Sequence, residues 1–206
     1  MFYLLKNDLY FHLIKVQKHN HISTFGMNRL IDLTGFDKDT FTEISTLGVI
    51  GGGSVVYALN DFVPKQSVGD IDIFVFGENK KIFNKLSVII RAATGCLFPK
   101  ESEYYWKEAN LMQVVTFENS RGKPIQLILS KMKDSQELVS NFTLDYVKCY
   151  FHKGMFGVTE DARQAHASRK ITLPDNPQKD IEIRVQKAIK KGFEVCDGEW
   201  EFSHWK

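Results

Sequence analysis

Two aspartates separated by one residue are the clearest candidates for chemistry in this chain. Asp70 and Asp72 lie in a segment whose side chains alternate between aliphatic residues and other types, which predicts a strand over 70–76. On a strand both carboxylates project from one face, roughly 6 to 7 Å apart along the chain. Two carboxylates at this spacing could hold Mg²⁺ for phosphoryl transfer. The same pattern also suits two solvated residues on the polar face of a half-exposed strand.

A glycine-rich turn precedes this strand. Residues 47–50 form a short apolar run that predicts a strand, and residues 54–60 suit a helix. Backbone N–H groups at the start of a helix favour phosphate, and glycine lets a phosphate approach closely. Gly52, Gly53 and Ser54 are therefore candidate nucleotide-binding residues, with Ser54 offering a hydroxyl donor. An ordinary turn that caps a helix is the structural alternative.

The glycines also fit part of a dinucleotide-binding fingerprint. Gly51 and Gly53 match its first two glycines, and an acidic residue follows about twenty positions later. Val56, however, stands where the third glycine belongs, and the acid is paired as Asp-x-Asp. We therefore favour phosphoryl transfer over a dinucleotide-binding oxidoreductase.

The rest of the chain predicts an α/β (α+β) fold. Besides the elements above, the patterns indicate helices over 79–93, 134–141, 159–170 and 179–191, and strands over 111–118, 124–129 and 146–151. The segment 119–123 has the composition of a hairpin loop. Hairpins of this kind exclude a regular βαβ alternation.

Three parts follow from this order of elements. Residues 1–45 are predicted to be a helical N-terminal extension, and residues 46–152 the core that carries the site. Residues 153–206 are predicted to be a helical C-terminal region packed on that core.

The glycine turn, Ser54 and the segment 69–74 together resemble the signature of the polymerase-β-type nucleotidyltransferase superfamily. The resemblance implies a nucleotidyltransferase-like mixed β-sheet flanked by helices. It implies that Gly52, Gly53 and Ser54 bind a nucleoside triphosphate while Asp70 and Asp72 bind Mg²⁺ or Mn²⁺. The implied reaction moves a nucleoside monophosphate to an acceptor hydroxyl and releases pyrophosphate. The acceptor would be RNA, another nucleic acid or a protein.

The sequence departs from this family at the third carboxylate. The strand predicted over 124–129 should carry it, but Gln126 stands at the expected position, and an amide cannot act as a base. Asp145 is the alternative third catalytic and metal-binding acid, although a turn residue would look the same. It lies in the segment 142–149, which resembles a segment of nucleotidyltransferase-like proteins of viruses and phages. A site with two carboxylates that relies on metal and substrate is the other alternative. If neither alternative holds, the chain would be a catalytically inactive binding or regulatory protein of this fold.

Basic residues elsewhere are candidate phosphate contacts. Lys131, which follows the strand predicted over 124–129, is a candidate nucleotide-binding residue by its position alone. Two predicted helices carry basic faces, formed by Arg163, His166, Arg169 and Lys170 and by Arg184, Lys187, Lys190 and Lys191. These faces could bind a triphosphate or a nucleic-acid backbone, or they could simply be solvated.

Composition limits the remaining possibilities. The 206 residues carry a formal net charge of only +2, which gives no evidence of a nucleic-acid partner. The three cysteines form no CxxC pair, which favours reduced thiols and a cytoplasmic protein. No apolar run is long enough to span a bilayer, so we expect no membrane partner.

Overall fold

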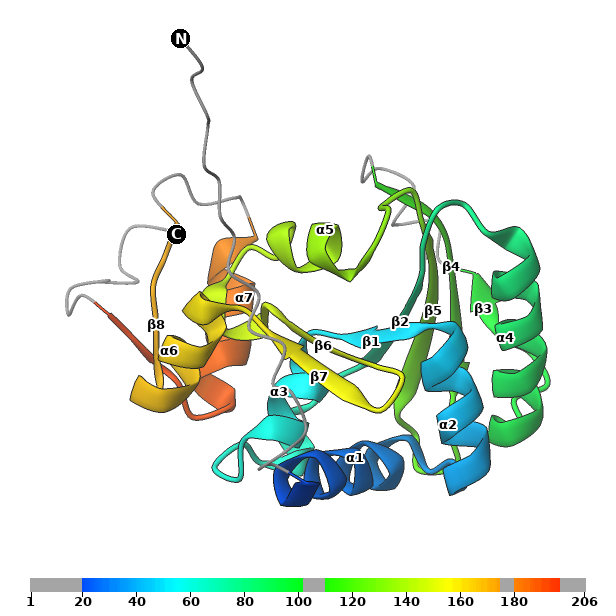
Figure 1. Cartoon of the computed structure of the whole chain (residues 1–206), viewed down its shortest axis with the longest axis horizontal. Helices are drawn as coiled ribbons and strands as arrows, with labels where there is room; N and C mark the ends of the chain where they lie inside the picture. Colours follow the sequence, from blue (N-terminus) through cyan, green and yellow to red (C-terminus); the bar gives the residue numbers. More distant parts are fainter. Residues whose placement is uncertain (1–19, 102–109, 175–179, 197–206) are drawn as a thin grey trace, which may run out of the picture.

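The computed structural model describes residues 20–101, 110–174 and 180–196, and its centre is a seven-stranded sheet (Figure 1). The strand order is β3-β4-β5-β2-β1-β6-β7. The strands are β1 Val49–Gly51, β2 Ile71–Val75, β3 Lys100–Glu101, β4 Leu111–Glu118, β5 Pro124–Ser130, β6 Cys149–His152 and β7 Met155–Val158. Within this described sheet only β2 and β5 pair in parallel. The predicted mixed sheet flanked by helices is confirmed.

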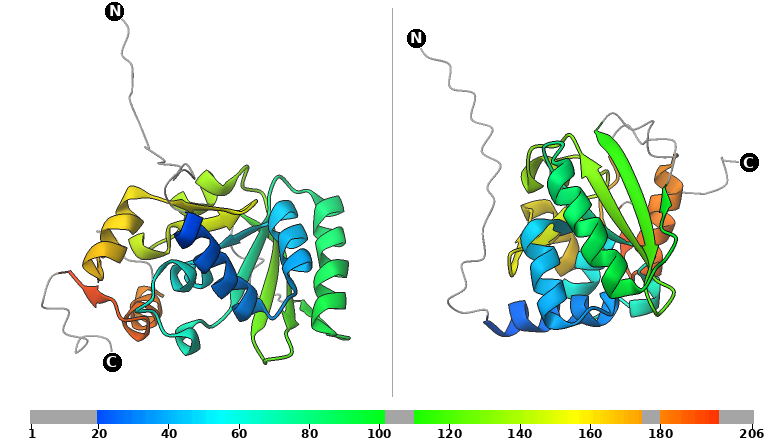
Figure 2. Two further views of the ribbon diagram at one scale, coloured as in Figure 1. Left: turned by 60° about the horizontal axis from the view of Figure 1, so that its bottom comes forward. Right: turned by 90° about the vertical axis from the view of Figure 1, so that its right-hand side faces the viewer.

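The larger part of the core lies on one face of the sheet. Helices α2 (Lys38–Leu47) and α4 (Lys80–Thr94) pack against each other and cover this face, with α4 lying along the strands (Figure 2). The apolar stripe predicted over 79–93 is confirmed, because α4 buries Phe83, Leu86 and Ile90. From β2 the side chains of Ile71, Ile73 and Val75 enter the same cluster. Helix α1 (Asn20–Thr34) packs instead on α3 (Gly53–Leu59).

The opposite face is only partly covered. The short helix α5 (Ser135–Ser140) packs there on a smaller cluster that includes Val49, Phe74 and Ile128. The alternation predicted for β2 is therefore confirmed, since Phe74 and Asp72 share the face opposite to Ile71, Ile73 and Val75.

The segment before β6 differs from the prediction. A strand was predicted over 146–151, but the chain first forms a 3-10 turn, η3 (Asp145–Val147), and β6 begins at Cys149. Tyr146 is buried in this turn, which explains the apolar pattern without a strand. The hairpin loop predicted over 119–123 is confirmed between β4 and β5.

The C-terminal segment contains α6 (Glu160–Ser168), α7 (Ile181–Lys190) and a small parallel sheet of β8 (Lys170–Ile171) and β9 (Glu194–Val195). Strand β7, which follows residue 152, continues the main sheet. The division at residues 45 and 152 stays a prediction, and residues 1–19 of the N-terminal extension lie outside the described residues. In the described part of the chain no helix is long and apolar enough to cross a membrane.

Candidate functional site

The structure brings the glycine turn and the acidic pair together. Gly51 of β1 pairs directly with Asp72 of β2. A Cβ atom at Gly52 would lie 3.9 Å from Oδ2 of Asp72, so this carboxylate faces the turn. Asp70 immediately precedes β2, two residues earlier on the same face. The two halves of the predicted site are thus one site in space.

The turn itself uses several of the groups that the sequence assigned to phosphate. The Gly52 N–H donates to the carbonyl of Cys149 over 3.2 Å. The Ser54 hydroxyl is buried and donates to the Gly51 carbonyl over 3.3 Å. In this structure Gly52 and Ser54 therefore stabilise the turn. Gly53, in the first turn of α3 and partly exposed, has an N–H with no partner within the helix.

Lys191, just past the end of α7, lies against this turn. Its side chain is buried, with 4% of the residue exposed. A Cβ atom at Gly53 would lie 3.3 Å from Cε and 3.7 Å from Nζ of Lys191. The sequence predicts Lys191 only as part of a basic helix face, because the sequence alone does not show which element that face contacts.

Two lysines fix the segment that leads into the acidic strand. Lys191 Nζ donates to the carbonyl of Ser67 over 3.0 Å, and Lys123 Nζ donates to the carbonyl of Val68. Ser67 lies three residues before Asp70, and Val68 lies two residues before it. The lysines come from the end of α7 and from the β4–β5 loop, so two distant parts of the chain hold Asp70 in place.

The charges of the site interact strongly. Burial, then the neighbouring Asp70 carboxylate, raises the pKa of Asp72 above its usual range, while Lys187 on α7 opposes this shift. Burial, then the neighbouring Lys187, lowers the pKa of Lys191, while Asp70 opposes that shift. Lys187 and Lys191 are four residues apart, so they lie on the same side at the end of α7. The acidic pair and these lysines therefore form one electrostatic cluster.

The donor set fits a hard divalent cation. Asp70 and Asp72 offer carboxylate oxygens, and a dication would offset both the burial and the neighbouring Asp70 charge that raise the pKa of Asp72. Gln126 pairs with Asp72 across the parallel strands, so its side chain projects beside that carboxylate. Mg²⁺ is often bound by one or two carboxylates plus water and substrate phosphates. The residues therefore fit one Mg²⁺ or Mn²⁺ held by Asp70 and Asp72.

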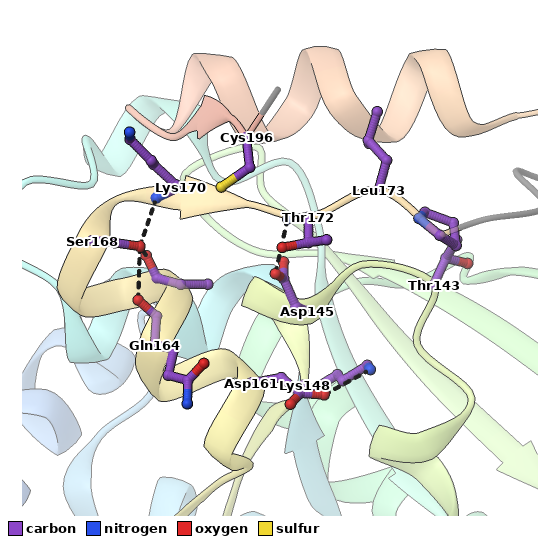
Figure 3. Close-up of a pocket in the computed structure, with 12 residues that line it drawn as sticks. Thr143, Asp145, Lys148, Asp161, Gln164, Ser168, Lys170, Thr172, Leu173 and Cys196 are labelled. Atoms are coloured by element: carbon purple, nitrogen blue, oxygen red, sulfur yellow. Dashed lines mark hydrogen bonds and ion pairs between the residues drawn. The ribbon is translucent and has the colours of Figure 1, made fainter. Parts of the chain in front are cut away.

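Asp145 lies in a different environment (Figure 3). Its carboxylate accepts the N–H of Thr172 over 2.9 Å and lies in a cavity of about 450 Å³. Burial raises the pKa of Asp145, and its charged neighbours are Lys148 and Asp161 rather than the acidic pair. Nowhere in residues 20–101, 110–174 and 180–196 do three His, Cys, Asp or Glu side chains group to hold a metal. The structure thus does not bring Asp145 to Asp70 and Asp72.

Lys131 is not brought to the site either. It is exposed and follows β5 at the end opposite to Gln126, which pairs with Asp72. Lys131 is five residues beyond Gln126, a span of roughly 16 Å along a strand. Lys131 does follow the strand predicted over 124–129, which is β5. The sequence alone could not show that this end of β5 lies away from the acidic pair.

The dinucleotide-binding alternative is wrong for this chain. That fingerprint belongs to a unit in which a strand, a helix and a second strand form a parallel pair. Here β1 and β2, which flank the glycine turn and α3, pair in antiparallel fashion. The turn therefore belongs to a different architecture.

Comparison with known proteins gave matches among solved structures alone. No family model and no curated protein matches the chain. The Thermotoga maritima CCA-adding enzyme complexed with tRNA_CCA is 10% identical, with a TM-score of 0.48, over 82% of this chain and 42% of that one.

Two further structures of CCA-adding enzymes are similar to the same extent. The complex with CTP is 9% identical, with a TM-score of 0.48, over 82% of this chain and 43% of that one. The apo form I is 11% identical, with a TM-score of 0.49, over 83% and 42% of the two chains. The chain spans less than half the length of these enzymes.

Proposed function

We propose that this protein is a metal-dependent nucleotidyltransferase, which moves a nucleoside monophosphate from a nucleoside triphosphate to an acceptor hydroxyl and releases pyrophosphate. The observation that carries the proposal is the Asp72 carboxylate facing the glycine turn, with Asp70 beside it and Lys191 next to Gly53. Metal ligands and cationic groups for a phosphate chain thus surround one turn. Such a combination suits phosphoryl transfer, where positioning and electrostatic stabilisation supply most of the catalysis.

Each part of the site has a defined task in this reaction. Asp70 and Asp72 would hold Mg²⁺ or Mn²⁺, which when bound neutralises charge on the phosphates and activates the acceptor hydroxyl. Gly52 and Ser54 keep the turn in its conformation, and the absence of a side chain at Gly53 lets the Lys191 side chain approach the turn closely. The acceptor is proposed to be RNA, another nucleic acid or a protein.

Binding of Mn²⁺ and nucleotide tests the metal site. In the wild type, Mn²⁺ together with ATP should raise the thermal midpoint of unfolding. Asp72→Asn should abolish the part of this rise in the thermal midpoint that Mn²⁺ contributes. In EDTA at neutral pH, the Asp72→Asn protein should be more stable than the wild type. The reason is that the substitution removes a carboxylate that is buried beside another carboxylate. Asp161→Asn, outside the site on α6, is the control.

Transfer of label from α-labelled nucleoside triphosphates to a mixed pool of RNA, DNA and proteins tests the reaction. Transfer by the wild type that is lost in Asp70→Asn and Asp72→Asn supports the enzyme. Transfer that survives both substitutions would show that the acidic pair is not the catalytic site.

A nucleotide-binding protein without transferase activity is the second candidate. Gln126 favours it, because a neutral amide stands beside Asp72 where the family resemblance implies a third carboxylate. Nucleotide binding without any transfer, under both metals and with all acceptors, would support this second function. Gln126→Glu is the informative variant, since a gain of transfer would show that the missing acid limits the reaction.

A further inference from the structure

Lys191 presents a charge that the described structure leaves without an ion pair. The residue is 4% exposed, and its amine donates to the carbonyl of Ser67, a neutral acceptor. No carboxylate of the described residues forms an ion pair with it. Burying an ammonium group is unfavourable unless it is paired or solvated. A buried lysine that points at the glycine turn therefore indicates an anionic ligand.

Neighbouring lysines support the interpretation that Lys191 binds an anionic ligand. Lys187 and Lys123 are both close enough to disfavour the charged form of Lys191. Lys123 and Lys191 both donate to carbonyls of the segment just before Asp70, and Lys187 lies one helical turn before Lys191. Gln126 supplies no third negative charge next to Asp72. Counted by formal charge, three lysines and two aspartates give this cluster one net positive charge before any metal is present.

The charge balance of the site determines whether a divalent cation or a polyphosphate binds more favourably as the first ligand. A divalent cation that entered alone would add two positive charges beside three ammonium groups. A polyphosphate that entered first would pair with the lysines and would leave the carboxylates free for a metal. Lys187 is exposed and Lys191 is buried one helical turn further on, so an anion that enters from solvent would meet Lys187 first.

We propose that Lys187 and Lys191 bind the polyphosphate of the nucleotide directly, and that this binding step does not require a divalent metal. The inference rests on the proposed nucleotide-binding function and adds an order to it: the polyphosphate binds to the lysines, and the metal then joins at Asp70 and Asp72. Two side chains of the C-terminal segment thereby become part of a site whose other residues come from the core.

The test is equilibrium binding of inorganic tripolyphosphate and of ATP in EDTA, measured by calorimetry. The wild type should bind both, and added salt should weaken both. Lys187→Gln should weaken binding about tenfold, as expected for the loss of one charged contact. Lys190→Gln, the exposed lysine on the same helix, is the matched control and should bind like the wild type. If Lys187→Gln also binds like the wild type, the inference is wrong.

Lys191→Met should weaken metal-free binding at least as much as Lys187→Gln. Because a substitution at a buried position can unfold the chain, its folding is checked by circular dichroism, and Lys187→Gln decides the question if Lys191→Met does not fold. The double variant Asp70→Asn with Asp72→Asn should retain tripolyphosphate binding in EDTA while losing Mn²⁺. Loss of metal-free binding in a folded double variant would contradict the inference.

The outcomes separate this inference from the proposed function. If the wild type binds ATP with Mn²⁺ but binds neither ligand in EDTA, the lysines are not an independent polyphosphate site and the proposed function stands. If the wild type binds no nucleotide under any condition, both proposals fail. Metal-free binding that depends on Lys187, without label transfer, would support the inference together with the non-catalytic function.

Discussion

Gly52 adopts a backbone conformation that a residue with a Cβ atom rarely takes. Its φ is 68° and its ψ is −139°, a combination found almost entirely in glycine. The conformation turns the chain from β1 into α3 beside Asp72. Lack of space does not exclude a larger residue at this position, because a Cβ atom would meet its nearest neighbours at 3.8 and 3.9 Å, which are ordinary contact distances. The glycine is therefore needed for its backbone freedom.

Gly52→Ala should lower the free energy of unfolding by about 1 to 3 kcal/mol, the usual cost of holding a residue in such a region. Urea unfolding followed by circular dichroism measures this change. Gly69→Ala is the matched control, because that glycine has no positive φ and a Cβ atom there meets nothing within 4 Å. Equal losses of unfolding free energy in Gly52→Ala and Gly69→Ala would show that the backbone conformation at Gly52 does not require glycine.

Helix α6 is joined to the turn η3 through a partly buried histidine. His166 contacts the carbonyl of Tyr146 through Nε2 over 2.8 Å, and its ring packs near Phe193. Burial lowers the pKa of His166, although the Tyr146 carbonyl and the Asp145 charge oppose the shift. The folded protein therefore favours the neutral imidazole.

This preference gives a pH dependence with a definite sign. The unfolded chain takes up the proton near pH 6.5, at a higher pH than the folded chain does. The contribution of His166 to the free energy of unfolding is therefore fully present above about pH 6.5. It is lost as the pH falls towards the lowered pKa that His166 has in the folded state.

His166→Gln should reduce the loss of unfolding free energy between about pH 7.5 and pH 5, because the titrating group is gone. Urea unfolding at the two pH values measures the difference. Gln164→Ala on the same helix, where the side chain is exposed, is the control and should keep the wild-type dependence. An unchanged dependence in His166→Gln would mean that other groups are responsible.

Across the molecule, the buried Asn119 connects helix α1 to the hairpin loop that carries Lys123. Asn119 is 5% exposed, and its amide donates to the carbonyls of Leu33 and Thr34 at the end of α1. Its Oδ1 accepts the N–H groups of Arg121 and Lys123. Since Lys123 holds the segment before Asp70, the connection reaches the site.

Asn119→Ala should lower the free energy of unfolding by about 1 to 3 kcal/mol, because buried carbonyls and N–H groups lose their partners. Amide hydrogen exchange should rise at the end of α1 and in the β4–β5 loop together. Ser120→Ala, at the exposed neighbouring position, is the control. Faster exchange confined to the hairpin would show that α1 does not depend on this residue.

The sequence alone was sufficient for elements whose pattern depends on local contacts. The alternation of β2 and the apolar stripe of α4 were predicted correctly, because a strand and a helix repeat with different periods. The strand predicted over 146–151 was partly wrong, since one buried tyrosine in a 3-10 turn gives the same apolar signal as the start of a strand. Local pattern cannot distinguish the two cases.

For the site, the sequence by itself identified the glycine turn and the acidic pair, because their residue types and their order along the chain are local properties. Only the tertiary structure decided which distant residues join them. Strand register placed Gln126 next to Asp72 and put Lys131 at the far end of β5. Packing of the segment after α7 brought Lys191 to Gly53, while Asp145 met Thr172 instead. Such contacts depend on how elements pack across long stretches of chain, which no spacing in the sequence encodes.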